Sequence, residues 1–161
     1  MITWTPPQPL TAYHTAFRQK GIYIIGGRYN PNLSVTPGLG DDDYWGRNWP
    51  NNFKPYYVGI SESLSSGVRG RLSRHSRKRG NMKISQRIRN NEPLFFIAAY
   101  GNDLAAYEAL FLCLKTDVQF SDNIRSEIER GTKREYERVR ANMTQYERDY
   151  YDNLDHDGRD G

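Results

Sequence analysis

A short apolar run, KGIYIIGG at residues 20–27, constrains the fold of this chain most. Apolar residues alternate within it and glycines flank it, which is typical of a strand. The alternation places Ile22 and Ile24 on one face of that strand and Tyr23 and Ile25 on the other. Strand tyrosines commonly bury the ring and hydrogen-bond the hydroxyl to a local partner. The run therefore raises the question of whether the partner of the Tyr23 hydroxyl is structural or functional.

Other segments predict the remaining elements of the domain. Apolar runs at 56–60 and 93–100 predict two more strands. The expected helices cover residues 10–19, 68–79, 82–90 and 104–115, the last capped by Asn102 or Asp103. This order predicts an α/β (α+β) domain with a small central antiparallel sheet of three strands, flanked by helices.

Length and composition predict one domain with an appendage. The 161 residues allow a buried core within residues 1–130, followed by a charged helix and an acidic tail over 131–161. The single cysteine, Cys113, excludes a disulfide framework or a thiolate zinc site within one chain. No run of 18 apolar residues occurs, and prolines stand where a secretory signal needs apolar residues. We therefore expect a soluble, cytoplasmic protein.

Residues 28–55 are dense in Gly, Pro, Asn and Asp, which predicts a long irregular loop. A loop of this length in a compact domain is commonly a lid or a binding loop. It contains Trp45 and Trp49, which either serve such a function or pin the loop to the core.

The C-terminal segment from Thr132 predicts one long helix with a narrow apolar seam. The seam residues are Tyr136, Val139, Met143, Tyr146 and Tyr150. We expect the seam to pack back on the domain, and a helix-to-helix homodimer contact is the alternative. The short acidic tail over 155–161 is expected to be disordered.

Positive charge is concentrated between the second and third strands. The net charge is +4, and residues 67–91 contain nine of the 23 basic residues and no acidic one. These are Arg69, Arg71, Arg74, Arg77, Lys78, Arg79, Lys83, Arg87 and Arg89. A solvated surface helix usually mixes charges of both signs. The segment therefore predicts contact with nucleic-acid phosphates, which carries no sequence information by itself.

Several polar residues follow one another in a characteristic order. The chain carries the triplets GIY (21–23) and YVG (57–59), Arg71 and His75 four apart, Glu108 in an apolar helix, and Asn123. Each feature alone is common, but the whole order resembles the GIY-YIG endonuclease superfamily over about residues 20–125. The resemblance implies metal-dependent hydrolysis of DNA.

Phosphodiester hydrolysis needs an activated water, positive charge at phosphorus and help for the leaving oxygen. A guanidinium can donate two parallel hydrogen bonds to phosphate oxygens, so Arg71 is the candidate for contact with the scissile phosphate. Its neighbours Arg69 and Arg74 could take the same role. His75 lies one helical turn on, over the same face. Its positive neighbours disfavour the protonated imidazole, which keeps the ring able to accept a proton. Alternatively, His75 only binds a phosphate.

Glu108 is the candidate metal ligand. Its carboxylate stands among Leu104, Leu110 and Phe111, where a charge needs a cation or solvent. A single carboxylate suffices for one Mg²⁺ (or Mn²⁺) ion when water and substrate phosphate supply further oxygens. The alternative is a glutamate on the exposed stripe of an amphipathic helix.

The resemblance also implies roles for the remaining residues. Tyr23 would help to activate the attacking water, although a tyrosine hydroxyl ordinarily has a pKa of about 10. A nearby metal, arginine and hydrogen-bonded histidine would make its phenolate more accessible. Tyr57 would position water or phosphate in the same site, and Asn123 would support the site by hydrogen bonding. The chain departs from the family pattern where Ile60 and Ser61 replace a common lysine, and where both connections between the motifs are longer.

We therefore expect a metal-dependent endonuclease whose partner is DNA, most simply double-stranded. The short chain favours a stand-alone nuclease of restriction or phage type in a bacterial or phage-infected cell, which is an analogy. Three alternatives remain: a non-cleaving nucleic-acid-binding module, a ribonuclease or toxin of the same fold, and a structural protein that assembles through the C-terminal seam.

Overall fold

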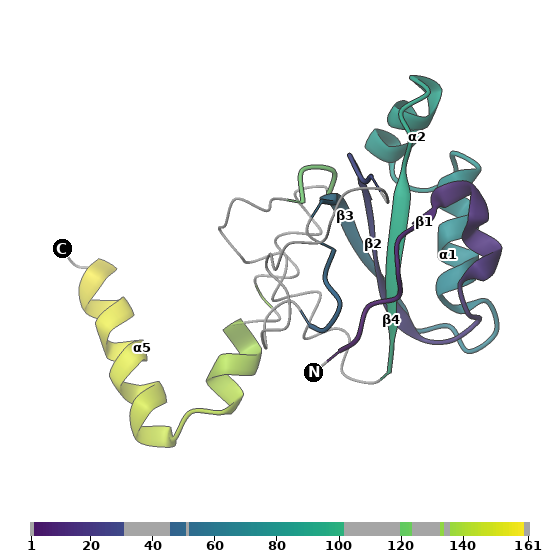
Figure 1. The fold of residues 1–161 in the computed structure, drawn as a ribbon. Helices are drawn as coiled ribbons and strands as arrows, with labels where there is room; N and C mark the ends of the chain where they lie inside the picture. The colour runs from purple at the N-terminus through teal and green to yellow at the C-terminus, as the bar shows by residue number, and fades with distance from the viewer. Residues whose placement is uncertain are drawn as a thin grey trace.

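The sheet at the centre of the domain has four antiparallel strands (Figure 1). The computed structural model describes residues 2–30, 46–50, 52–101, 120–123, 133 and 136–159. The strands are β1 (Gln8–Pro9), β2 (Gly21–Gly27), β3 (Lys54–Ser61) and β4 (Phe95–Tyr100), in the spatial order β1-β4-β2-β3. The mixed α/β class is thus confirmed.

The number of strands is a correction, since the sequence predicts three. The additional strand, β1, pairs with Phe95 and Phe96 at the outer edge of β4, and the Leu10 N–H donates to the Leu94 carbonyl at 2.9 Å. A proline is tolerated in an edge strand because one side of such a strand needs no hydrogen-bonding partner. The two-residue strand shows no apolar alternation, so only its tertiary partner reveals it.

Strand β2 lies between β3 and β4 and is buried along its whole length. Ile22 and Ile24 pack in one apolar cluster, and Tyr23 and Ile25 pack in a second one. The predicted alternation of faces is confirmed. The side chain of Tyr23 therefore points to a different layer of the molecule from the side chains of its isoleucine neighbours.

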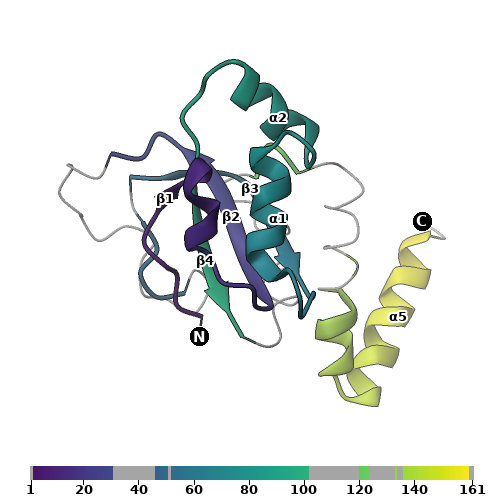
Figure 2. The ribbon, with the colours of Figure 1, turned by 90° about the vertical axis from the view of Figure 1, so that its right-hand side faces the viewer.

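Three helices contribute to the apolar cluster on the face of the sheet that carries Tyr23, two over the face and the third beyond the end of the sheet (Figure 2). They are the 3-10 helix η1 (Leu10–Thr15) and the α-helices α1 (Gly67–Ser76) and α2 (Met82–Arg89). Helix α1 buries Val68 and Leu72 completely. A Cβ at Gly21 would lie 2.6 Å from the Val68 side chain, so this glycine lets α1 approach the sheet closely. Helices occur at the three predicted places, but the one expected over 10–19 is a 3-10 helix that ends at Thr15, and α1 ends at Ser76 instead of continuing to residue 79.

Aromatic residues cover part of the opposite face of the sheet. Trp4 and Trp49 are buried there, with ring centroids 5.7 Å apart in an edge-to-face arrangement. The Arg47 N–H donates to the Ile2 carbonyl at 2.8 Å, and the Trp4 N–H donates to the Arg47 carbonyl at 2.9 Å. Trp49 therefore pins the end of the predicted long loop to the core, whereas Trp45 lies outside the described residues.

The C-terminal segment forms two helices instead of the single one predicted. Among the described residues, residue 133 and residues 136–141 are helical before the break, and α5 covers Gln145–Arg159 after it. A capping box begins α5: the Glu147 N–H donates to the Thr144 hydroxyl at 3.2 Å, and the Thr144 N–H donates to the Glu147 carboxylate at 3.3 Å. The cap separates the two helices. The tail expected to be disordered continues α5 as far as Arg159.

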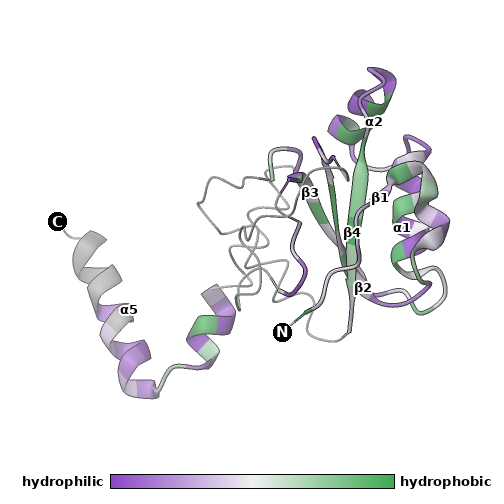
Figure 3. Cartoon of the chain, viewed as in Figure 1, coloured by the Kyte–Doolittle hydropathy of each residue, from purple (hydrophilic) through white to green (hydrophobic). Residues whose placement is uncertain are grey.

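The apolar seam of this segment does not pack back on the domain, which corrects a further expectation. Tyr136, Val139, Tyr146 and Tyr150 are between 41 and 80% exposed. Helix α5 stands apart from the sheet in two views (Figures 1 and 2), and its described surface is largely polar (Figure 3). A homodimer contact through this segment stays a prediction.

Two further expectations concern helices. The predicted helix over 104–115, which contains Cys113, lies outside the described residues, as does the predicted domain boundary at residue 130. Within the described ranges, no helix combines the length and the apolar character needed to cross a membrane.

Candidate active site

The hydroxyl of Tyr23 meets the imidazole of His75 beneath helix α1. The Tyr23 Oη and His75 Nε2 atoms are 3.0 Å apart, and both side chains are buried. Tyr23 comes from the central strand β2 and His75 from the last turn of α1. Two residues that are 52 positions apart in the chain are thereby joined, so the partner of Tyr23 is a titratable side chain.

The turn after α1 determines which histidine nitrogen carries the proton. The backbone N–H of Asn81 points to Nδ1 of His75 at 3.3 Å, and a backbone N–H can only donate. Nδ1 is therefore an acceptor, and the neutral ring carries its proton on Nε2. Gly80 allows this approach, because a Cβ there would lie 2.3 Å from Nδ1. The imidazole consequently donates to the Tyr23 oxygen, which favours the negatively charged form of that oxygen.

His75 is neutral at physiological pH. Burial, together with the smaller effects of the positive charges of Arg71 and Arg74, lowers its pKa from the usual 6.5 to about 4. The predicted effect of the positive neighbours is thus present, although burial dominates. With Nδ1 already accepting a hydrogen bond, the ring acts as a donor to Tyr23 and not as the proton acceptor that the sequence suggested.

A cleft of about 360 Å³ opens beside this pair. Its lining comprises Tyr57, Arg71, Arg74, His75, Arg79, Gly80, Asn81 and Met82. The ring centroid of Tyr57 lies 5.0 Å from that of His75 and 6.2 Å from that of Tyr23. Tyr23 itself is 1% exposed and lies behind the described wall of the cleft. The cleft therefore presents Tyr57 and His75, and Tyr23 stands behind them.

The mouth of the cleft is positively charged. The side chains of Arg71 and Arg74 are exposed on successive turns of α1. Among the described residues, no carboxylate pairs with either guanidinium or lines the cleft. Such a cleft offers forked donors to an anion such as a phosphate.

Asn123 supports the strand that carries Tyr57. Its side-chain oxygen accepts from the Val58 N–H at 2.9 Å, and its side-chain NH₂ donates to the Val58 carbonyl at 3.0 Å. Strand β3 is at the edge of the sheet, so these backbone groups would otherwise lack a strand partner. Asn123 is buried, and its role in supporting a catalytic site stays a prediction.

Two of the nine basic residues have structural contacts instead. Arg87 donates to both oxygens of Asp122 at 2.6 and 3.0 Å and to Glu92 at 2.9 Å, and its guanidinium stacks on the Tyr56 ring at 3.6 Å. The hydrogen bonds to Asp122 raise the pKa of Arg87 above its usual value. Arg69 Nε donates to the Ala16 carbonyl at 2.7 Å. Both guanidinium groups are half-buried and are held by these contacts.

The other basic residues lie at the surface of α1, α2 and the turn between them. Lys83 is exposed, although its Nζ donates to the Ser121 carbonyl at 2.9 Å. Arg77 Nε donates weakly to the Ser73 carbonyl at 3.4 Å. The remaining exposed residues of this group are Lys78, Arg79 and Arg89. These residues, with Arg71 and Arg74, are called the basic surface below; Arg71, Arg74 and Arg79 are the ones that line the cleft.

The predicted metal ligand, Glu108, lies outside the described residues. The described lining of the cleft contains no carboxylate, and the described part of the chain contains no group of three or more His, Cys, Asp or Glu side chains that could hold a metal ion. Tyrosine, arginine and a hydrogen-bonded histidine do not make a magnesium site by themselves. A magnesium site here would therefore need a carboxylate from outside the described residues, and Glu108 stays the predicted one.

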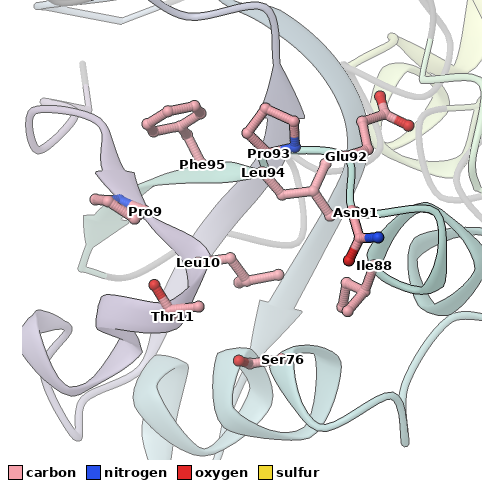
Figure 4. A pocket seen from close by; sticks show the side chains of 10 residues that line it. All are labelled: Pro9, Leu10, Thr11, Ser76, Ile88, Asn91, Glu92, Pro93, Leu94 and Phe95. Carbon is pink, nitrogen blue, oxygen red and sulfur yellow. The ribbon is translucent and has the colours of Figure 1, made fainter.

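A second cleft, of about 300 Å³, lies between β1, the start of β4 and the end of α2 (Figure 4). Its lining is largely apolar and includes Leu10, Ile88 and Leu94. Its one acidic residue, Glu92, pairs with Arg87. None of the predicted catalytic residues lines this cleft.

Two residues of the site were not predicted from the sequence. Asn81 precedes helix α2 as its N-cap, a position that the order Asn-Met-Lys-Ile at 81–84 could have revealed. Gly59 was noted only as part of a triplet, although its lack of a side chain makes room for the Tyr23 ring.

Comparisons with protein-family models, with curated proteins and with solved structures found no match to this chain.

Proposed function

We propose that this protein is a metal-dependent DNA endonuclease of the GIY-YIG kind, which hydrolyses phosphodiester bonds with a tyrosine-assisted water. The observation that carries the proposal is the meeting of Tyr23, His75 and Tyr57 at a cleft lined by Arg71 and Arg74. These residues come from β2, β3 and α1. A buried hydroxyl–imidazole pair next to exposed arginines suits reaction at an anionic phosphate.

Substrate binding is assigned to the arginines of the cleft. Arg71 and Arg74 can each donate two parallel hydrogen bonds to phosphate oxygens, and their charge offsets the negative charge that develops at phosphorus. Arg79 lines the same cleft and extends this positive lining toward α2. The scissile phosphate would therefore lie against α1, next to Tyr57.

Water activation is assigned to Tyr23, with His75 as its hydrogen-bond donor. A Tyr23 phenolate would take one proton from water as the water oxygen bonds to phosphorus, and the bond from phosphorus to the leaving oxygen breaks. The leaving oxygen would take a proton from solvent. The hydrogen bond from His75 Nε2 favours the phenolate. Tyr57 would hold the water or a phosphate oxygen at the cleft wall.

The proposal includes one divalent metal ion, with Glu108 as its ligand. Mg²⁺ or Mn²⁺ bound there would neutralise charge on the phosphate and assist the leaving oxygen. Only one protein ligand is proposed, so binding of the ion without DNA would be weak.

DNA binding is assigned to the basic surface, which contacts the backbone without reading the sequence. The contributing side chains are Arg71, Arg74, Arg77, Lys78, Arg79, Lys83 and Arg89. Arg69 and Arg87 are left out of this set because both are half-buried and held by backbone or carboxylate oxygens, whereas Arg77 and Lys83 are exposed.

The testing experiment incubates the purified protein and Glu108→Ala with supercoiled plasmid, with and without Mg²⁺. Nicking or linearisation that requires Mg²⁺ and is lost in the variant supports the proposal. Matched DNA and RNA duplexes distinguish a deoxyribonuclease from a ribonuclease. Salt-sensitive retardation of the plasmid without any cleavage would replace the nuclease with a non-cleaving binding module.

A further inference from the structure

Asn81 is the residue at which separate parts of the candidate site meet. Its backbone N–H donates to Nδ1 of His75 at 3.3 Å. Its side-chain oxygen accepts from the backbone N–H groups of Lys83 and Ile84 at 2.9 and 3.0 Å, which caps helix α2. Its side-chain NH₂ donates to the Asp122 carbonyl at 2.7 Å. One residue thus contacts the histidine, helix α2 and the chain around Asp122.

The chain around Asp122 continues this connection to the edge strand β3. The Asp122 N–H donates to the Tyr56 carbonyl at 2.8 Å. The side chain of Asn123 pairs with both backbone groups of Val58 at 2.9 and 3.0 Å. Tyr57, whose ring lines the cleft, stands between these two anchored residues. A continuous path of hydrogen bonds therefore joins the imidazole to the strand that carries Tyr57.

We propose that Asn81 is a positioning residue, which holds His75 as a donor to Tyr23 and couples that imidazole to the strand carrying Tyr57. Its role in catalysis rests on the proposed function, whereas its effect on the imidazole does not. Without the bond from its side chain to Asp122, the turn at residue 81 loses one of its two anchors. The N–H would then no longer be held against Nδ1, and the ring would exchange between its two tautomers.

The test compares two variants that each lose one hydrogen bond at Asn81. Asn81→Ser keeps an oxygen that can cap α2, but it lacks the NH₂ group that bonds Asp122. The matched control, Ser85→Ala, removes the hydrogen bond from the Ser85 hydroxyl to the Asn81 carbonyl at 3.0 Å and leaves the contact to His75 in place. Long-range ¹H–¹⁵N NMR spectra of the histidine rings report the tautomer of each protein in the absence of DNA.

We expect the Nε2–H tautomer of His75 in the wild type and in Ser85→Ala, and a mixture of tautomers in Asn81→Ser. Plasmid cleavage by Asn81→Ser should fall about ten- to a hundredfold, as with other residues that orient a reacting side chain. An Nδ1–H tautomer in the wild type overturns the inference. So does an unchanged tautomer or an unchanged cleavage rate in Asn81→Ser, or an equal change in Ser85→Ala.

The NMR readout also separates this inference from the proposed nuclease. A wild-type protein that cleaves neither DNA nor RNA would overturn the proposed function. If that protein still showed the expected tautomers in the three chains, the control of His75 by Asn81 would stand, without its catalytic meaning.

Discussion

The phenol ring of Tyr23 occupies the space that a side chain at residue 59 would need. Tyr23 and Gly59 are partners across strands β2 and β3, and a Cβ on Gly59 would lie 2.5 Å from the Tyr23 hydroxyl oxygen and 2.6 Å from Cζ. The glycine therefore leaves a flat surface for the ring, from which the hydroxyl reaches His75. The GIY and YVG triplets therefore meet across β2 and β3, where Tyr23 faces Gly59, which lies 36 positions further along the chain.

Gly59→Ala should displace the Tyr23 ring and break its hydrogen bond to His75. Overpacking of a well-packed core by one methyl group costs about 1–3 kcal/mol, so the melting temperature should fall. Plasmid cleavage should fall with it, because the hydroxyl leaves its position. Thermal unfolding and cleavage assays check both effects. A variant with the wild-type melting temperature and rate would show that the ring is not held as described.

Tyr23→Phe should nearly abolish cleavage while the fold persists, because only a hydroxyl is removed. Loss of proton transfer by a positioned side chain costs about 10²–10⁴-fold in rate. The matched control is Tyr100→Phe, which also loses a hydroxyl that accepts a hydrogen bond, from the Phe17 N–H at 2.8 Å. Single-turnover cleavage should be normal in this control.

The burial of Tyr23 makes a comparison with Tyr57→Phe informative. Tyr57 lines the cleft, whereas Tyr23 stands behind it. If Tyr57→Phe proves the slower enzyme, Tyr57 is the group that activates water and Tyr23 orients His75. If Tyr23→Phe cleaves as fast as Tyr100→Phe, the Tyr23 hydroxyl has a structural role alone.

The stability of the protein should fall between about pH 6.5 and pH 4 because of His75. In the folded state its pKa is lowered to about 4, so the unfolded chain takes up a proton in this range that the folded chain does not. The full effect is on the order of 3 kcal/mol, from about 1.4 kcal/mol for each unit of pKa. Denaturant unfolding at several pH values measures it. The difference between wild type and His75→Gln should vary with pH across this window, and a constant difference would contradict the prediction.

Mutation of Arg87 should affect stability, whereas mutation of Arg89 should affect DNA binding, although the two residues are close together on α2. Arg87→Met leaves the buried carboxylate of Asp122 without its partner and should cost about 3–5 kcal/mol of unfolding free energy. Arg89→Ala, at an exposed position, should change stability by less than about 0.5 kcal/mol. It should instead weaken DNA binding and reduce the slope of log K against log salt concentration by about 1, as expected for the loss of one phosphate contact. Denaturant titrations and binding measured over a series of salt concentrations separate the two effects, and equal behaviour of the variants would contradict the assignment.

Asn123→Ala should loosen the edge of the sheet at Val58. The substitution leaves two backbone groups without their partner, and each such loss costs about 1–3 kcal/mol. Hydrogen exchange of the Val58 amide should accelerate. Asn142→Ala is the control, since Asn142 donates only at an exposed site to the Arg138 carbonyl. Unchanged exchange at Val58 would mean that another group protects this amide.

Sequence patterns predicted those helices and strands that are determined by interactions between residues close together in the chain. The alternation around Tyr23 predicted β2 and the face of each side chain, because a strand of period two has only two ways to place its apolar residues. Helix α2 was predicted close to its observed bounds of Met82–Arg89. The strand β1 and the capping box at Thr144 were missed. The first depends on a distant partner, and the second was hidden within a continuous apolar seam.

The order of residue types along the chain determined by itself that Tyr23, Tyr57, Arg71 and His75 were candidates for one site. Only the tertiary structure decided their arrangement, because hydrogen-bond direction and burial depend on groups far apart in the chain. The turn at Asn81 makes His75 a donor to Tyr23. Burial makes that ring neutral, and two carboxylates withdraw Arg87 from the basic surface. Charge and periodicity are properties of a sequence, whereas the partner of each charge is a property of the fold.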